Sequence, residues 1–257
     1  MSKSNYHKVY DFYYAFNLLE NSFVEKYEIH RTKIKLLNEY RIIFNKEFKN
    51  DNIGNFVNNL LDLIYIYYGC AINFNVDINN AFNTLIKSKL IHDNRMFKPI
   101  NLNLTNFQKV NQIINQNKVN TMQKNNTLNN YSINKELLSV KLGNINSIIN
   151  EFIYNINNNL SLVKSNITNG LFELYSVGSI LGLNIDKLFE ELHISNMTML
   201  CSENDASRLM QFKQNNEVKN LNDIEIHKSN LENYYILYNK STGEILKSEQ
   251  YINSIFV

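Results

Sequence analysis

The chain has 257 residues, a formal net charge of +2, and 44% hydrophobic and 12% aromatic residues. This composition excludes a wholly disordered protein, and the length allows one large domain or two small ones. No apolar run approaches the roughly 18 to 20 residues that cross a membrane. The nearly balanced charge gives no clear nucleic-acid signal. We therefore expect a folded protein without a membrane partner.

The amino terminus and the cysteines indicate the compartment. The first residues, MSKSNYHKVYDFYYAF, place Asp and Tyr where a secretory leader has its apolar segment. The two cysteines, Cys70 and Cys201, form no pair with metal-ligand spacing. Both features predict a reducing, intracellular environment, which we interpret as the cytoplasm.

Helical periodicity dominates the chain. Apolar residues recur at helical steps over residues 30–48, 75–90, 146–160 and 184–197. In the second of these segments, Asp77 is placed to cap the first turn. We therefore predict four amphipathic helices in these segments, each with one face in the core.

Three other segments lack this helical period. Pro99, the only proline, lies in such a segment and marks the best internal boundary. Residues 115–132 are polar and rich in asparagine, which predicts a loop. Within residues 234–248, two apolar runs flank KSTG, which predicts a short β-hairpin with Gly243 in its turn.

An internal repeat organises the helical part. SNYHKV at residues 4–9 returns as TNFQKV at 105–110, an offset of 101. LLNEYRIIF at 36–44 returns as IINEFIYNI at 148–156, an offset of 112. Because the order and the spacing are both kept, the matches predict that one four-helix unit occurs twice.

A third match extends the repeat to the last helix of each unit. DINNAFNTLIKSKL matches IDKLFEELHISNM with an offset of 107, which aligns Phe82 with Phe189. The chain then divides into a first helical unit, a linker, a second helical unit and a carboxyl-terminal extension with the hairpin, at residues 1–93, 94–104, 105–215 and 216–257.

These motifs resemble a known family. The pieces NYHKVYDFYYAF, LLNEYRIIF and NNLLDLIYIYYGCAINFNVDINNAF of the first half are similar to the phage and bacterial all-α nucleoside triphosphate pyrophosphohydrolases of the MazG and phosphoribosyl-ATP pyrophosphohydrolase group. The second half supplies FEELHISNMTMLCSENDA and the tail YYILYNKSTGEILKSEQY. Because relatives assemble as dimers with shared sites, the resemblance implies an all-α fold of two MazG-like bundles packed as an intrachain pseudo-dimer.

The resemblance also implies where a metal site would lie. The family holds Mg²⁺ with carboxylates in a pattern like E-E-x-x-E followed by E-x-x-D, and Mg²⁺ chemistry needs several such oxygens. In this chain Glu39 and Asp62 keep acidic places, and Asp62 is the candidate metal ligand. The other acidic places of the first unit hold Tyr40, Ile43 and Asn59.

The second unit keeps still fewer acids. Glu151 remains, followed by Phe152 and Asn155, and Asn166 and Asn169 stand in the facing pattern. An asparagine carbonyl can touch a metal ion but brings no charge. These substitutions predict that the metal site is largely lost.

The HISNM helix end supplies the candidate nucleotide contacts. His193, Ser195 and Asn196 form a polar set at the end of an amphipathic helix, and in relatives this helix end lies near the nucleotide. A histidine whose hydrogen bonds are satisfied at an ordinary helix end is the alternative interpretation for His193. The tyrosines of YIYYG, by contrast, are more typical of a core than of nucleotide stacking.

Three functional interpretations stay open. The leading one is a MazG-like protein without catalysis or a bound cofactor, which binds a nucleotide or a protein partner. The second is an active, Mg²⁺-dependent pyrophosphohydrolase with one hybrid site, in which Glu39 and Asp62 serve catalysis and His193, Ser195 and Asn196 contact the nucleotide. The third is a structural helical subunit of a larger, virus- or phage-encoded assembly. Another carboxylate close to Asp62 would favour the enzyme, whereas surrounding aromatic side chains would disfavour it.

Overall fold

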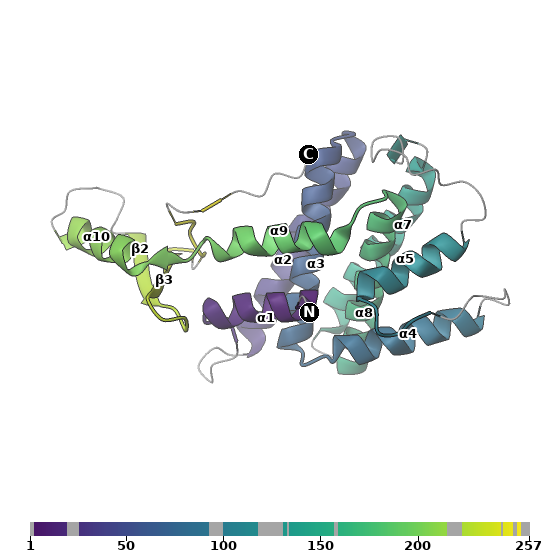
Figure 1. The fold of residues 1–257 in the computed structure, drawn as a ribbon, viewed down its shortest axis with the longest axis horizontal. Helices are drawn as coiled ribbons and strands as arrows, with labels where there is room; N and C mark the ends of the chain where they lie inside the picture. Colours follow the sequence, from purple (N-terminus) through teal and green to yellow (C-terminus); the bar gives the residue numbers. More distant parts are fainter. Residues whose placement is uncertain are drawn as a thin grey trace.

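The protein is mostly helical, with a small antiparallel sheet near its carboxyl terminus (Figure 1). The computed structural model describes residues 3–19, 26–92, 100–117, 131–132, 134–156, 159–214, 223–242, 244–248 and 251–252. Pro99, most of the predicted loop at 115–132, and Gly243 lie outside the described residues. Within the described parts, each helix is too short or too polar to cross a bilayer.

Eight helices of the described segments form the main body. The first four are α1 (Asn5–Ala15), α2 (Lys26–Lys49), α3 (Ile53–Asn73) and α4 (Ile78–His92). The next four are α5 (Asn106–Asn117), α7 (Lys135–Asn155), α8 (Leu160–Ile180) and α9 (Ile185–Met197). The four predicted helical segments fall on α2, α4, α7 and α9, so the apolar period identified them correctly. The segment 146–160 is not one helix, however, because Asn159 caps the separate helix α8.

The helix starts recur along the chain. Each of six N-cap side chains accepts a hydrogen bond from the backbone N–H three residues later, which satisfies a free donor of the first turn. The corresponding caps are Ser4 and Thr105, Asn52 and Asn159, and Asp77 and Asn184. The first pair has the offset of 101 and the other two have the offset of 107 found in the sequence.

The ends of α3 and α8 recur as well. Both helices are followed by a residue in the left-handed region, Asn75 with φ 50° and Gly182 with φ 73°. Asparagine and glycine tolerate this conformation best, and it stops a helix. The two positions again differ by 107. Helix starts and helix ends are therefore repeated at the predicted spacing.

Equivalent helices of the two halves make equivalent contacts. α2 packs on α3 as α7 packs on α8, α3 crosses α8 at the centre, and α1 packs on α9 while α5 packs on α4. At the centre, the hydroxyls of Tyr68 and Tyr175 hydrogen-bond each other at 2.7 Å, and both side chains are buried. These tyrosines are equivalent under the offset of 107. The core therefore lies where the two halves meet.

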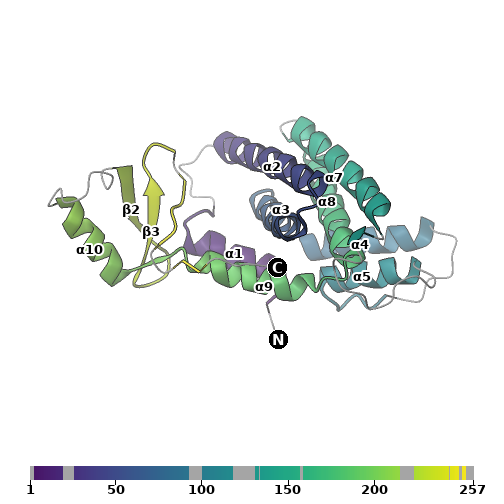
Figure 2. The ribbon, with the colours of Figure 1, turned by 90° about the horizontal axis from the view of Figure 1, so that it is seen from above.

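The carboxyl-terminal part forms a separate sheet with one helix. The elements are β1 (Cys201–Ser202), α10 (Glu203–Gln214), β2 (Ile224–Lys228) and β3 (Tyr234–Asn239). The sheet has the antiparallel order β1-β3-β2. Figure 2 shows this group at one end of an elongated molecule. Because α10 packs on β1 and β3, it belongs to this group.

The predicted hairpin is only partly matched. Residues after β3 do turn back, but they pair with it through one bridge between Tyr238 and Ile245. The longer hairpin is instead β2–β3, in which Ile224 faces Asn239 and Lys228 faces Tyr235. The prediction found β3 and the reversal after it, whereas β1 and β2 were missed.

Candidate functional site

Asp62 lies on α3 beside Tyr40 of α2. Burial raises the pKa of Asp62 to about 7, and the positive charge of Lys247 partly opposes this shift. Burial also raises the pKa of Tyr40 to about 12, with Asp62 as the next cause and Glu39 and Tyr251 as smaller ones. Asp62 is therefore only partly ionised near neutral pH, and its surroundings include an aromatic ring and a lysine.

The carboxyl-terminal segment is anchored next to this place. The Ser195 hydroxyl donates to the carbonyl of Ile252 at 2.5 Å, and the Ile252 N–H donates to the Thr198 hydroxyl at 2.9 Å. The ammonium of Lys247 lies 4.1 Å from the centre of the Tyr251 ring. Ser195, predicted to face a nucleotide, is buried, and its hydroxyl binds the backbone at Ile252.

Glu39 directly precedes Tyr40 on α2. Its side chain is half exposed and lies 3.9 Å from the ammonium of Lys35, one turn earlier on α2. Within the residues that the structure describes, no three His, Cys, Asp or Glu side chains come together in a way that could hold a metal ion. Among the described residues, Asp62 therefore does not belong to a group of three such side chains.

His193 and Asn196 meet α3 through Tyr65. The Tyr65 hydroxyl lies 3.4 Å from Nδ1 of His193 and is also hydrogen-bonded by Asn196. Tyr65 follows Asp62 by three residues, so the α9 end and Asp62 lie about one helical turn apart along α3. Burial lowers the pKa of His193, and the charge of Asp11 opposes this most strongly. The imidazole is therefore neutral near pH 7.

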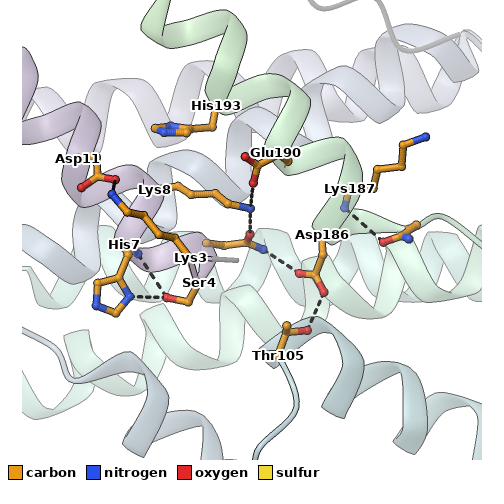
Figure 3. A network of polar contacts seen from close by, with 12 residues as sticks. Lys3, Ser4, His7, Lys8, Asp11, Thr105, Asp186, Lys187, Glu190 and His193 are labelled. Carbon is orange, nitrogen blue, oxygen red and sulfur yellow. Dashed lines mark hydrogen bonds and ion pairs between the residues drawn. The ribbon is translucent and has the colours of Figure 1, made fainter. Parts of the chain in front are cut away.

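A second polar cluster joins α1 to α9 on the amino-terminal side. Lys8 is buried and forms an ion pair with Glu190, and Asn5 donates to Asp186 at 3.0 Å (Figure 3). Asp186 also accepts from the Thr105 hydroxyl at 2.6 Å. Burial raises the pKa of Asp186, while the hydrogen bonds from Thr105 and Asn5 oppose the shift.

Sequence reasoning missed this cluster. The signal that could have found it is the repeated motif SNYHKV and TNFQKV, which contains Asn5 and Lys8 in the first copy and Asn106 and Lys109 in the second. A repeated lysine on the buried face of a short amphipathic helix is unusual, because burying an ammonium group is costly without a partner.

Comparison with known proteins gives little further identification. No family model and no solved structure matches the chain. The chain is 27% identical to "Uncharacterized protein L479" of Acanthamoeba polyphaga mimivirus over an alignment of 136 residues that covers 48% of the chain. The match covers about half of that relative, 52% of its length. The similarity is compatible with a virus-encoded protein.

Proposed function

We propose that this chain is a MazG-like helical pseudo-dimer that binds a nucleotide without hydrolysing it. The pseudo-dimer is supported by the hydrogen bond between Tyr68 and Tyr175, since equivalent residues of two units meet each other only near a two-fold axis. The first helix of each half packs on the last helix of the other half, α1 on α9 and α5 on α4, and these contacts support the same arrangement.

The main support for a protein that does not hydrolyse the nucleotide is the environment of Asp62. Triphosphate hydrolysis in this family needs Mg²⁺ held by several ionised carboxylates, which neutralise charge in the transition state. Asp62 instead has a pKa of about 7 and lies near Lys247, whose charge disfavours a cation. We therefore assign no catalytic step to Asp62 or Glu39.

Nucleotide binding is supported by the polar end of α9. His193 and Asn196 lie at the junction with α3, where a neutral imidazole and an amide offer hydrogen bonds to a base or a sugar. Tyr65 stacks on Phe189 with a centroid distance of 5.4 Å, which fixes the wall behind them.

The test combines binding with turnover. We expect calorimetric titration with a panel of nucleoside triphosphates to detect binding, and His193→Ala with Asn196→Ala to weaken it at least tenfold. Ile194→Ala is the matched control, because Ile194 is on the same helix but 55% exposed. We expect no pyrophosphate release above background with Mg²⁺ or Mn²⁺. Binding that the double substitution leaves unchanged would contradict the proposed site.

The hybrid hydrolase is a second candidate. It is favoured by one observation, the closeness of Asp62 to Tyr65 on the same face of α3 that meets His193. Turnover that disappears in Asp62→Ala would establish it and overturn the non-catalytic proposal. Turnover unaffected by that change would indicate a contaminant or a different metal site.

A structural role in a viral assembly is the third candidate. It is favoured by the similarity to a mimivirus protein and by exposed apolar side chains on α2 and α7, among them Ile42, Val140 and Tyr154 at 57%, 57% and 78% exposure. Sedimentation of the purified chain tests it, since self-association that Tyr154→Lys abolishes would support this role.

A further inference from the structure

The two halves contain equivalent lysine clusters that differ in charge. In one half, Lys8 of α1 contacts Asn5 and pairs with Glu190 of α9. In the other, the ammonium of Lys109 on α5 donates to the side-chain Oδ1 of Asn83 on α4 at 2.9 Å and lies 3.4 Å from the side-chain Oδ1 of Asn106. Asn83 and Glu190 occupy equivalent places, because their numbers differ by 107.

In the second contact of each cluster, an asparagine again stands where the other half has an acidic residue. Asn5 donates to the carboxylate of Asp186, whereas Asn106 donates to the amide oxygen of Asn79 at 3.3 Å. Asp186 and Asn79 again differ by 107. Tyrosines complete both clusters, since Asn5 donates to the Tyr175 hydroxyl at 3.2 Å and Asn106 hydrogen-bonds Tyr68. Amides therefore replace both carboxylates around Lys109.

Among the described residues, this exchange leaves the buried ammonium of Lys109 without a carboxylate partner. Lys109 is 3% exposed, and its described partners are amide oxygens. Burial lowers its pKa, as expected for a lysine without a nearby carboxylate. An isolated buried charge is costly, and a bound anion would offset that cost.

A cavity lies beside Lys109. Its volume is about 340 Å³, at the small end of the range for ligand pockets. Its lining, as far as the structure describes it, includes Lys3, Tyr6, Asn83 and Lys109 but no carboxylate. Asp186 borders the cavity, but its carboxylate is already bonded to the lining residues Asn5 and Thr105. Lys3 forms an ion pair with Asp11 at 2.6 Å, whereas the described contacts of Lys109 are with amide oxygens. Lys109 therefore supplies the uncompensated positive charge of the cavity, and the rest of the polar lining is rich in amide side chains.

We propose that this cavity binds a small molecule through a carboxylate group, which takes the place beside Lys109 that Glu190 has beside Lys8. The chain itself supplies the argument for a carboxylate, since the equivalent cluster is complemented by carboxylate side chains. The amides of Asn79 and Asn83 are neutral and small enough to leave this space open. The site is distinct from Asp62 and from the α9 end, so the proposal does not depend on the proposed function.

The experiment measures thermal unfolding of the full chain with sodium acetate, sodium succinate, sodium phosphate and sodium chloride at matched ionic strength. We expect either carboxylate to raise the Tm by about 3 °C at ten times its Kd, while chloride and phosphate do less. A carboxylate bound by the folded chain alone stabilises it in this way. Equal shifts with all four salts, or a shift with phosphate alone, would overturn the proposal.

Three variants test whether the carboxylate-dependent rise in Tm comes from the cavity beside Lys109. Asn79→Asp with Asn83→Glu installs the carboxylates of the other half, so we expect a higher Tm without salt and no further carboxylate response. Lys109→Met should also abolish the response. Lys8→Met is the matched control, because it removes the equivalent lysine of the occupied cluster and should lower the Tm but keep the response. A response that survives in both the double variant and Lys109→Met would overturn the assignment.

Discussion

At the residue scale, Asp62 makes the stability of the protein depend on pH. Its pKa is raised from 3.8 to about 7, so the folded state holds this proton more tightly than the unfolded state. The resulting stabilisation is complete below pH 3.8 and is lost as the pH rises through about 7. At alkaline pH, the partly buried carboxylate of Asp62 is an unfavourable charge that the fold tolerates.

We predict that Asp62→Asn removes this dependence. The pKa difference sets an upper limit of about 4 kcal/mol, and we expect about 2 kcal/mol between pH 5 and pH 8 because the side chain is only partly buried. Urea unfolding at both pH values measures it. Asp51→Asn is the control, since hydrogen bonds from Lys135 and then Tyr131 lower the pKa of Asp51, and its loss should shift both values equally. A parent protein equally stable at both pH values would contradict the assignment.

The tyrosine pair at the centre provides a second test at this scale. Tyr68→Phe and Tyr175→Phe should each lower the free energy of unfolding by about 1 to 2 kcal/mol, because each leaves a buried hydroxyl with one partner fewer. The double substitution should cost less than the sum. A double-mutant cycle by urea unfolding measures this coupling, and strict additivity would mean that the two hydroxyls do not interact.

At the element scale, glycines decide how closely the two central helices approach. A Cβ at Gly170 of α8 would lie 2.3 Å from the ring of Tyr67 on α3, a distance that requires backbone movement or displacement of a buried ring. A Cβ added at Gly143 of α7 would have no neighbouring atom within 4 Å in the described structure. Substitutions at Gly170 therefore test the close contact between α3 and α8, whereas substitutions at Gly143 test helix propensity alone.

We predict opposite effects of alanine at these glycines. Gly170→Ala should destabilise the protein by about 1 to 3 kcal/mol, as for overpacking of a core. Gly143→Ala should stabilise it by about 0.5 to 1 kcal/mol, because it lowers the backbone entropy of the unfolded chain. Thermal and urea unfolding measure both. Stabilisation by both substitutions would show that α3 and α8 do not pack closely at Gly170.

The helices could be predicted from the sequence better than the sheet and the clusters. The apolar period of residues 184–197 is local, so it specified α9 without any tertiary information. The strand Cys201–Ser202 has two residues and exists through its pairing with Tyr234 and Tyr235, which no local pattern reveals. The contrast between Lys8 and Lys109 needed the packing of α1 on α9 and of α5 on α4, although the repeat had already aligned the lysines.

At the scale of the whole molecule, each half depends on the other. The first half alone would expose the faces of α1 and α4 that pack on α9 and α5, and it would expose the centre of α3. We expect such a half to fold only if a second copy covers these faces, because the proposed two-fold axis makes a copy an acceptable substitute. Its stability should then depend on its concentration.

The charges around the two lysines predict which half pairs better with itself. In a dimer of residues 105–257, Lys109 of each copy would meet Glu190 of the other, and Asn106 would meet Asp186. In a dimer of residues 1–104, Lys8 would meet Asn83 and leave two buried ammonium groups without a counter-charge. We therefore expect the second half to dimerise at least tenfold more tightly by analytical ultracentrifugation. Replacing Asn83 by Glu in the first half should narrow this difference, whereas a first half that folds cooperatively as a monomer would contradict the two-fold arrangement itself.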